Sequence, residues 1–248
     1  MQTFDFWHKL NLHRAKVVIG MVAIFLAFGH CAFAQLEGEV NLPNSDNRKL
    51  KYGFSIGVFN SNFKLKYADV FTTQAFDSVQ SINAFNKFGA SLGIIGNFKL
   101  AQYLDLVLNP RVGFYQNEIE IVYTDPTREP FLANTDLSRV EIPLLLKYKS
   151  ARRGNTRMYL IGGITPGIRV SGSVKEEDVA TRIIVEDESL SIEFGFGLDL
   201  YYPLFRFSPE IRFSRGINNM LSPNASPNTE GLESLTLNSV TLYLQFGD

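Results

Sequence analysis

Eight segments of this chain alternate apolar side chains with polar or small ones at a period of two, and they recur over most of its length. They lie near 52–60, 88–100, 103–115, 140–149, 158–169, 190–200, 205–213 and 240–246. In the clearest segment, one side consists of Leu104, Leu106, Leu108, Pro110, Val112 and Phe114. Successive side chains of a strand point to opposite faces, so each segment is predicted to be a strand with one apolar face.

The connections between these segments alternate in length. Short turns are expected near 101–102, 150–156 and 203–204, and long polar loops near 61–87, 124–137, 173–189 and 219–236. Short periplasmic turns and long outer loops are typical of barrels of the outer membrane. We therefore predict an all-β fold, an eight-stranded antiparallel up-and-down transmembrane β-barrel over residues 51–248. The even strand number places both ends of the barrel on the periplasmic side.

A secreted β-sandwich or a lipocalin-like barrel would also show this alternation, because its apolar faces can be buried against each other. The interior of an eight-stranded barrel only just holds its side chains, and about five large apolar residues from every strand would overfill it. We therefore expect the apolar faces to meet lipid and the opposite faces to line the lumen. The expected interfacial girdle near the short turns is Tyr103, Tyr148, Tyr159, Tyr201, Tyr202, Phe205 and Phe246.

The faces expected to line the lumen carry charges of both signs in equal number. They are Arg111, Lys147, Arg169 and Arg212 with Glu141, Glu193, Asp199 and Glu210. A buried ion without a partner is costly, so our hypothesis is a structural ion-pair network that plugs the lumen. The alternatives are a polar ion path, for which eight strands leave no open channel, or a carboxylate pair for acid–base catalysis. Pro143 and Pro166 fall inside predicted strands and are expected to mark bulges or irregularities.

The first 34 residues have the pattern of a cleaved secretory signal. An apolar run near 17–28 follows three basic residues and precedes Ala32-Phe33-Ala34, which predicts cleavage between Ala34 and Gln35. The run is shorter than the roughly 20 apolar residues of a membrane-spanning helix. Residues 35–50 are then expected to form a polar periplasmic lead-in to the barrel.

All three histidines, the only cysteine and the only tryptophan lie in that signal. The mature chain therefore lacks the side chains of Ser-His and Cys-His nucleophiles and of most zinc sites. A lipid anchor on Cys31 is the alternative to cleavage, but Phe28-Gly29-His30 before it fits poorly. Glu176, Glu177 and Asp178 lack the spacing of a calcium loop. We expect no catalytic residue, metal or cofactor, and the net charge of −1 is not that of a nucleic-acid binder.

Several motifs follow one another along the mature chain. They are NLP at 41–43, YGF at 52–54, EIPLLLKY at 141–148, FRFSPEIRF at 205–213, GINN at 216–219 and LESL at 232–235. In order and spacing they resemble the PorT-like family of outer-membrane barrels of Bacteroidota. One departure is the end of the sequence, where Gly247-Asp248 follows Phe246, whereas many such barrels finish on an aromatic residue.

The resemblance implies a non-enzymatic outer-membrane protein required for type IX secretion, which exports surface proteins and, in some species, gliding adhesins. Its implied partners are outer-membrane lipid and other secretion subunits, and it carries over no catalytic residue. Two other functions stay open. One is a general surface barrel that binds ligands or partners through its long loops, which are polar and carry Asp69, Asp77, Asp125, Arg128 and Glu129. The other is an enzyme acting on lipid, which the lack of histidine disfavours.

Overall fold

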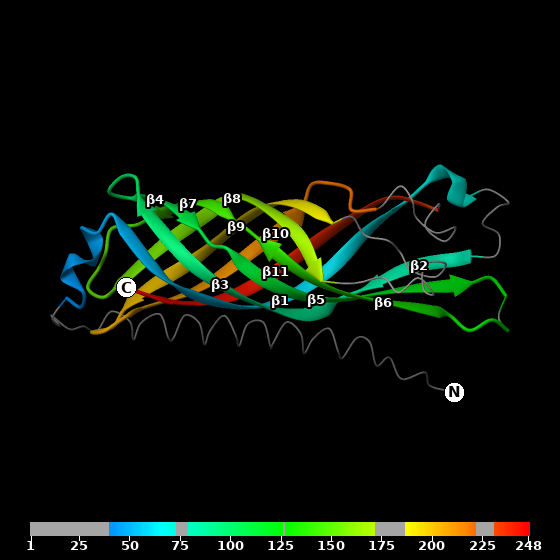
Figure 1. The fold of residues 1–248 in the computed structure, drawn as a ribbon, viewed down its shortest axis with the longest axis horizontal. Coiled ribbons are helices and arrows are strands. Elements are labelled where there is room, and N and C mark those ends of the chain that lie inside the picture. The colour runs from blue at the N-terminus through cyan, green and yellow to red at the C-terminus, as the bar shows by residue number, and fades with distance from the viewer. Residues whose placement is uncertain (1–39, 73–78, 126, 172–186, 222–230) are drawn as a thin grey trace, which may run out of the picture. The chain divides into compact units, whose positions relative to one another are not determined.

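The computed structural model describes residues 40–72, 79–125, 127–171, 187–221 and 231–248 (Figure 1). The chain divides into two compact units, Met1–Val40 and Asn41–Asp248. The predicted signal and its cleavage residues, Ala34 and Gln35, lie outside the described residues, as do the first five residues of the lead-in.

The second unit is built from strands and two short 3-10 helices. They are η1 (Pro43–Asp46), β1 (Leu50–Tyr67), η2 (Asp69–Thr72), β2 (Val79–Phe85), β3 (Lys87–Lys99), β4 (Leu104–Leu108), β5 (Arg111–Tyr123), β6 (Phe131–Glu141), β7 (Leu144–Lys149), β8 (Thr156–Ser171), β9 (Glu188–Tyr201), β10 (Arg206–Gly216) and β11 (Leu232–Gly247). No helix in these ranges is long and apolar enough to cross a membrane.

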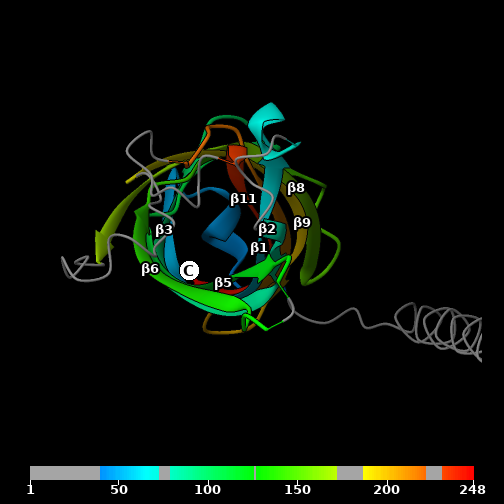
Figure 2. The ribbon, with the colours of Figure 1, turned by 90° about the vertical axis from the view of Figure 1, so that its right-hand side faces the viewer.

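The strands form one closed antiparallel barrel, and three of them are interrupted. β2 and β3, β4 and β5, and β6 and β7 are each two parts of one strand, which leaves eight strands in the ring. The last strand pairs with the first, with Phe54 opposite Phe246, so the sheet has no free edge around the barrel. Figure 2 shows this ring along its axis. The predicted eight-stranded up-and-down barrel is confirmed.

Two of the three breaks within strands fall at prolines, and the third, between β2 and β3, falls at Asn86. Asn109-Pro110 separates β4 from β5, and Ile142-Pro143 separates β6 from β7, because proline cannot donate a ladder hydrogen bond. Pro143 thus marks the irregularity expected of it. Pro166 stays inside β8, with no register shift against β9, and its carbonyl accepts a hydrogen bond from Ile142 N–H at 2.9 Å. The irregularity at that level therefore belongs to the neighbouring strand.

Polar side chains lie inside the barrel and apolar ones outside it. In β7, Leu144, Leu146 and Tyr148 are exposed, whereas Lys147 and Lys149, which alternate with them, are buried. Large apolar side chains cover the outer surface over all eight strands. A protein folded in water shows the opposite arrangement, so this exterior is suited to lipid.

The predicted aromatic girdle is wrong for two of its seven residues. Tyr159 and Tyr201 are each only 3% exposed and point into the barrel. The strand period explains this, because Tyr159 shares its face with the buried Arg157 and Ile161. Tyr148 and Tyr202 do lie on the outside, together with Tyr103 and Phe205.

The strands run further at the long-loop end than the sequence predicted. β1 continues to Tyr67, and β2, the start of β6 and the start of β11 occupy parts of the expected loops 61–87, 124–137 and 219–236. In these extensions the two faces exchange character. Along β5 the outward residues change from Val112 and Phe114 to Glu118 and Glu120, while Ile119 and Ile121 point inward and are buried. The prediction of loops in these extensions is wrong, because a strand with a polar outer face has the composition of a loop.

Candidate functional site: the filled lumen and its closed end

A cluster of interlocking ion pairs fills the middle of the lumen. Arg111 on β5 donates from Nε to Glu141 Oε2 at 2.6 Å and from Nη2 to Glu193 Oε1 at 2.5 Å. Arg212 on β10 donates from Nη1 to the same Glu193 at 3.0 Å and also pairs with Glu210. We call these five residues the central cluster. They come from β5, β6, β9 and β10, so the cluster ties opposite parts of the barrel together.

Neutral side chains supply the remaining hydrogen bonds of the central cluster. Tyr115 donates to Glu141 Oε1 at 2.5 Å, while Tyr159 and Gln245 donate to Glu210 Oε2 at 2.9 and 3.0 Å. The guanidinium of Arg212 also lies 4.4 Å from the centre of the Tyr243 ring. Each carboxylate thus has several donors, which is what a charge removed from water requires.

A second set of pairs lies closer to the end of the barrel formed by the turns 100–103, 150–155 and 202–205, here called the turn end. Lys147 Nζ donates to Asp199 Oδ1 at 2.8 Å, and Lys149 Nζ donates to Asp105 Oδ1 at 2.6 Å. Ser208 donates to the same oxygen of Asp199 at 2.7 Å. All four charged residues are buried.

The structure brings together all of the expected lumen charges except one. Arg169 lies apart from them, is partly exposed and pairs with Asp187. The expected balance of charge is not found: among the described residues, eight basic and five acidic side chains are buried. The basic ones are Lys51, Arg111, Arg139, Lys147, Lys149, Arg157, Arg206 and Arg212; the acidic ones are Asp105, Glu141, Glu193, Asp199 and Glu210.

The residues missed by the sequence analysis were detectable in part. Asp105 and Lys149 lie an even number of residues from the inward-facing residues of their strands. The alternation therefore predicts that both side chains point into the lumen. Lys51, Arg157 and Arg206 lie at strand ends, where the periodicity is too short to assign a face.

Apolar side chains fill the lumen at its other end, the loop end. Phe63, Ile82, Ile119 and Leu235 belong to this loop-end cluster, and all are nearly inaccessible to solvent. Between the loop-end and central clusters is a cavity of about 20 Å³, lined in part by Tyr115 and Glu141. That is room for about one water molecule. Side chains therefore occupy the barrel along its described length.

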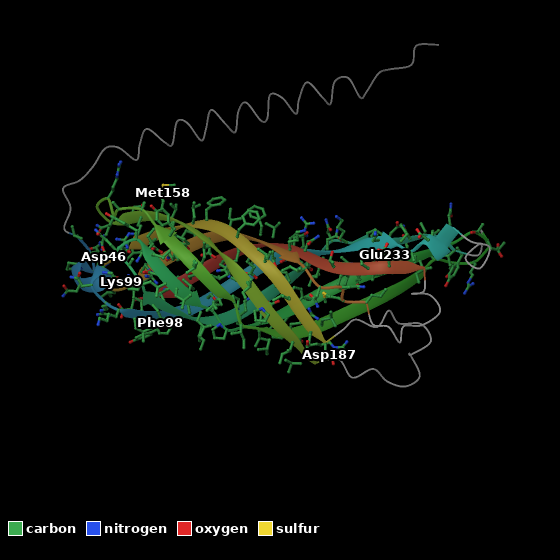
Figure 3. The ribbon with its side chains drawn as sticks, turned by 90° about the horizontal axis from the view of Figure 1, so that it is seen from above. Asp46, Phe98, Lys99, Met158, Asp187 and Glu233 are labelled. Carbon is green, nitrogen blue, oxygen red and sulfur yellow. The ribbon has the colours of Figure 1, made fainter. Side chains whose placement is uncertain are left out.

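Residues 41–49 of the lead-in close the turn end, and we call them the plug segment. Figure 2 shows this blue segment inside the ring of strands, and Figure 3 places Asp46 and Lys99 together at that end, away from Glu233. Asp46 faces Arg157 through both carboxylate oxygens, each 2.9 Å from a guanidinium nitrogen. Lys99 Nζ donates to the Asp46 carbonyl at 2.6 Å, and Asn41 donates from Nδ2 to the Tyr201 carbonyl at 3.0 Å.

The charge of Arg157 sets the ionisation of Asp46. Partial burial raises the pKa of this carboxyl, but the hydrogen bond and positive charge of Arg157 outweigh it and hold the pKa below its ordinary value. At neutral pH Asp46 is therefore ionised, and its ion pair fixes the plug segment to β8.

No group of three His, Cys, Asp or Glu residues that could hold a metal ion occurs in the described ranges. The loop acids Glu176, Glu177 and Asp178 lie outside them.

Residues 33–222 match the sequence profile of the outer membrane protein beta-barrel domain family. Among solved structures, the outer membrane protein OprG from Pseudomonas aeruginosa shares 14% identity, with 80% of this chain and 92% of OprG covered at a TM-score of 0.44. Outer membrane protein AlkL shares 10% identity, with 86% and 91% covered at 0.44, and Neisserial surface protein A shares 11%, with 77% and 95% covered at 0.40. No curated protein matches the chain.

Proposed function

Because the chain belongs to the outer membrane protein beta-barrel domain family, we propose that it is a non-enzymatic accessory barrel of the type IX secretion machinery, of the PorT-like kind. The support for this finer assignment is the ordered set of motifs, which spans most of the barrel. The EIPLLLKY segment at 141–148 covers the interruption at Pro143, and the NLP motif at 41–43 lies in the plug segment. In this proposal the protein serves the export of surface proteins through contacts with other secretion subunits.

The filled lumen is the observation that carries a contact role. A conduit needs a continuous water-filled path, whereas ion pairs occupy the middle of this barrel and apolar side chains occupy its loop end. Because the buried carboxylates are held by arginine, lysine and tyrosine donors, they are also poorly suited to act as acid–base catalysts. In this proposal the surfaces at the two ends of the barrel make the contacts with other proteins.

Deletion of the gene in its own organism tests the secretion role. We expect type IX cargo to accumulate in the periplasm and to return to the cell surface when a plasmid-borne copy is supplied. Co-purification of secretion subunits with the plasmid-borne protein would identify its contacts. Normal cargo delivery in the deletion strain refutes the proposal.

A second candidate function is surface binding through the loop end. The observation in its favour is that β1, β2, β5, β6 and β11 extend as strands beyond the apolar exterior and enclose a core of their own. Such a core makes a firm platform for loops that bind a ligand. A deletion strain with normal cargo delivery but altered surface binding would favour this function over the first.

The orientation and processing of the chain belong to the same proposal. A plug segment in the periplasm requires that the chain be exported, and we propose that its signal is cleaved before Gln35. N-terminal sequencing of the protein from outer membranes should therefore begin at Gln35, and a protease added to intact cells should leave the turn end uncut.

A further inference from the structure

A basic pocket lies at the turn end, between the plug segment and the turns that follow β3 and β7. Its volume is about 840 Å³. Its charged lining consists of Lys49, Lys99, Lys149, Arg152 and Arg157 with a single acid, Asp46. A pocket of this size takes a small molecule or a headgroup and is too small for a folded domain.

Carboxylates neutralise only part of this lining. Asp46 pairs with Arg157, and Asp105 pairs with Lys149. Lys99 donates to the carbonyl of Asp46, and Arg152 donates to the carbonyl of Gly154 at 2.8 Å. A carbonyl group satisfies a donor but does not cancel its charge, so these cations leave the pocket positive.

A buried lysine next to the pocket gives an independent indication. Lys51 is only 2% exposed, and no described side chain forms a hydrogen bond or ion pair with it. Its charge acts on Asp46 and on Lys149, both of which line the pocket. Arg206 and Lys149 disfavour its ammonium form more than Asp105 and Asp199 favour it, so its charge is only partly compensated in the barrel interior. An anion in the adjoining pocket would supply the missing negative charge.

We propose that this pocket binds a phosphate group carried by a small or headgroup-sized ligand. Arginine and lysine together suit a tetrahedral oxyanion, since the guanidinium offers paired donors and each ammonium a point charge. Tyr103 also lines the pocket and is exposed on the outer side of the barrel, so the opening lies where lipid headgroups meet the turns. The phosphate can therefore come from a phospholipid headgroup or from a soluble phosphate ester. The site does not depend on a role in secretion.

The test is calorimetric titration of the purified full-length barrel, in an uncharged sugar detergent, with glycerol 3-phosphate. We expect saturable binding that weakens as salt is raised. The double variant Lys49→Gln/Lys99→Gln should bind about tenfold more weakly, as expected for lost charge-assisted contacts. Lys64→Gln is the matched control, because Lys64 is an exposed lysine at the loop end of β1. Heat-modifiable gel migration shows that each variant is folded.

Lys51→Met separates an anion site from a merely basic surface. In the absence of the probe this variant should unfold at a higher temperature than the wild type, because an unpaired buried charge is removed. It should also lose most of the stabilisation that glycerol 3-phosphate gives the wild type. Equal stabilisation of both proteins by the probe refutes the assignment of Lys51.

Competition identifies the source of the phosphate. If nanodiscs containing phosphatidylglycerol abolish glycerol 3-phosphate binding, the site takes a lipid headgroup; if binding persists, it takes a soluble ester. The proposal is overturned if the probe does not saturate, or if Lys64→Gln weakens binding as much as the double variant. It is also overturned if only a peptide rich in aspartate binds, since the pocket would then serve a protein partner.

Discussion

Removal of Arg212 should destabilise the barrel much more than removal of the exposed Arg215 on the same strand. Arg212 is 2% exposed and pairs with both Glu193 and Glu210. Arg212→Met keeps most of the side-chain volume but leaves two buried carboxylates with one fewer cation. Breaking a buried pair by removing one partner costs about 3–5 kcal/mol. We expect a loss in this range in the free energy of unfolding, with the lower half favoured because Glu193 retains Arg111.

A second substitution shows whether charge or shape causes the loss. Glu210→Gln removes one buried charge while its side-chain oxygen still accepts from Tyr159, so Arg212→Met/Glu210→Gln should recover part of the stability. Arg215→Ala is the control, because Arg215 is exposed on the same strand and should change stability by less than about 0.5 kcal/mol.

The assay is urea-dependent unfolding in lipid vesicles, followed by heat-modifiable gel migration. A loss for Arg212→Met no larger than that for Arg215→Ala would show that the central cluster does not hold the barrel. If the double variant were less stable than Arg212→Met, loss of shape rather than unpaired charge would explain the result.

Other contacts of the barrel lead to three more predictions. Glu141→Ala should lower the urea midpoint less than Arg212→Met, because Arg111 keeps its second carboxylate. Asp46 has a lowered pKa in the folded state, so its contribution to stability should be complete above the ordinary carboxyl pKa of 3.8. That contribution should be lost as acid protonates the folded carboxyl, so proteolysis of the plug segment should increase only below that pH. Phe114→Arg should cost about 2–4 kcal/mol on the lipid-facing side of β5, whereas Glu120→Arg on the same side should unfold in urea close to wild type.

The sequence was sufficient to predict the ring of strands because period-two alternation reports directly on faces. The same alternation was misread where its faces exchange character. At Ile119 and Ile121 apolar residues point inward and the outward residues are polar, so an apolar outer face alone predicts a shorter strand and a longer loop. The change from apolar to polar outward residues marks the position along β5 at which the strand emerges from the lipid.

Contacts made across the barrel could not be predicted in this way. Asp46 and Arg157 are 111 residues apart, and a four-residue 3-10 helix leaves no periodic signal. The excess of buried cations includes Lys51 and Arg206, which lie at strand ends. These two residues come close to each other and to other charges only when the barrel folds. These are tertiary properties, set by closure of the ring.

Glycines on the inward faces show that the lumen is filled by close packing and not by a loose assembly of charges. A Cβ atom on Gly57 would lie 2.7 Å from the ring of Tyr243, and one on Gly197 would collide with the hydroxyl of Tyr159. Both tyrosines contact the central cluster. Because the two glycines have no Cβ atom, they leave the space that these tyrosine rings occupy. A path through this lumen would require several rings and ion pairs to move together. Since packed interiors resist such rearrangement, we assign the proposed contacts with other molecules to the ends of the barrel.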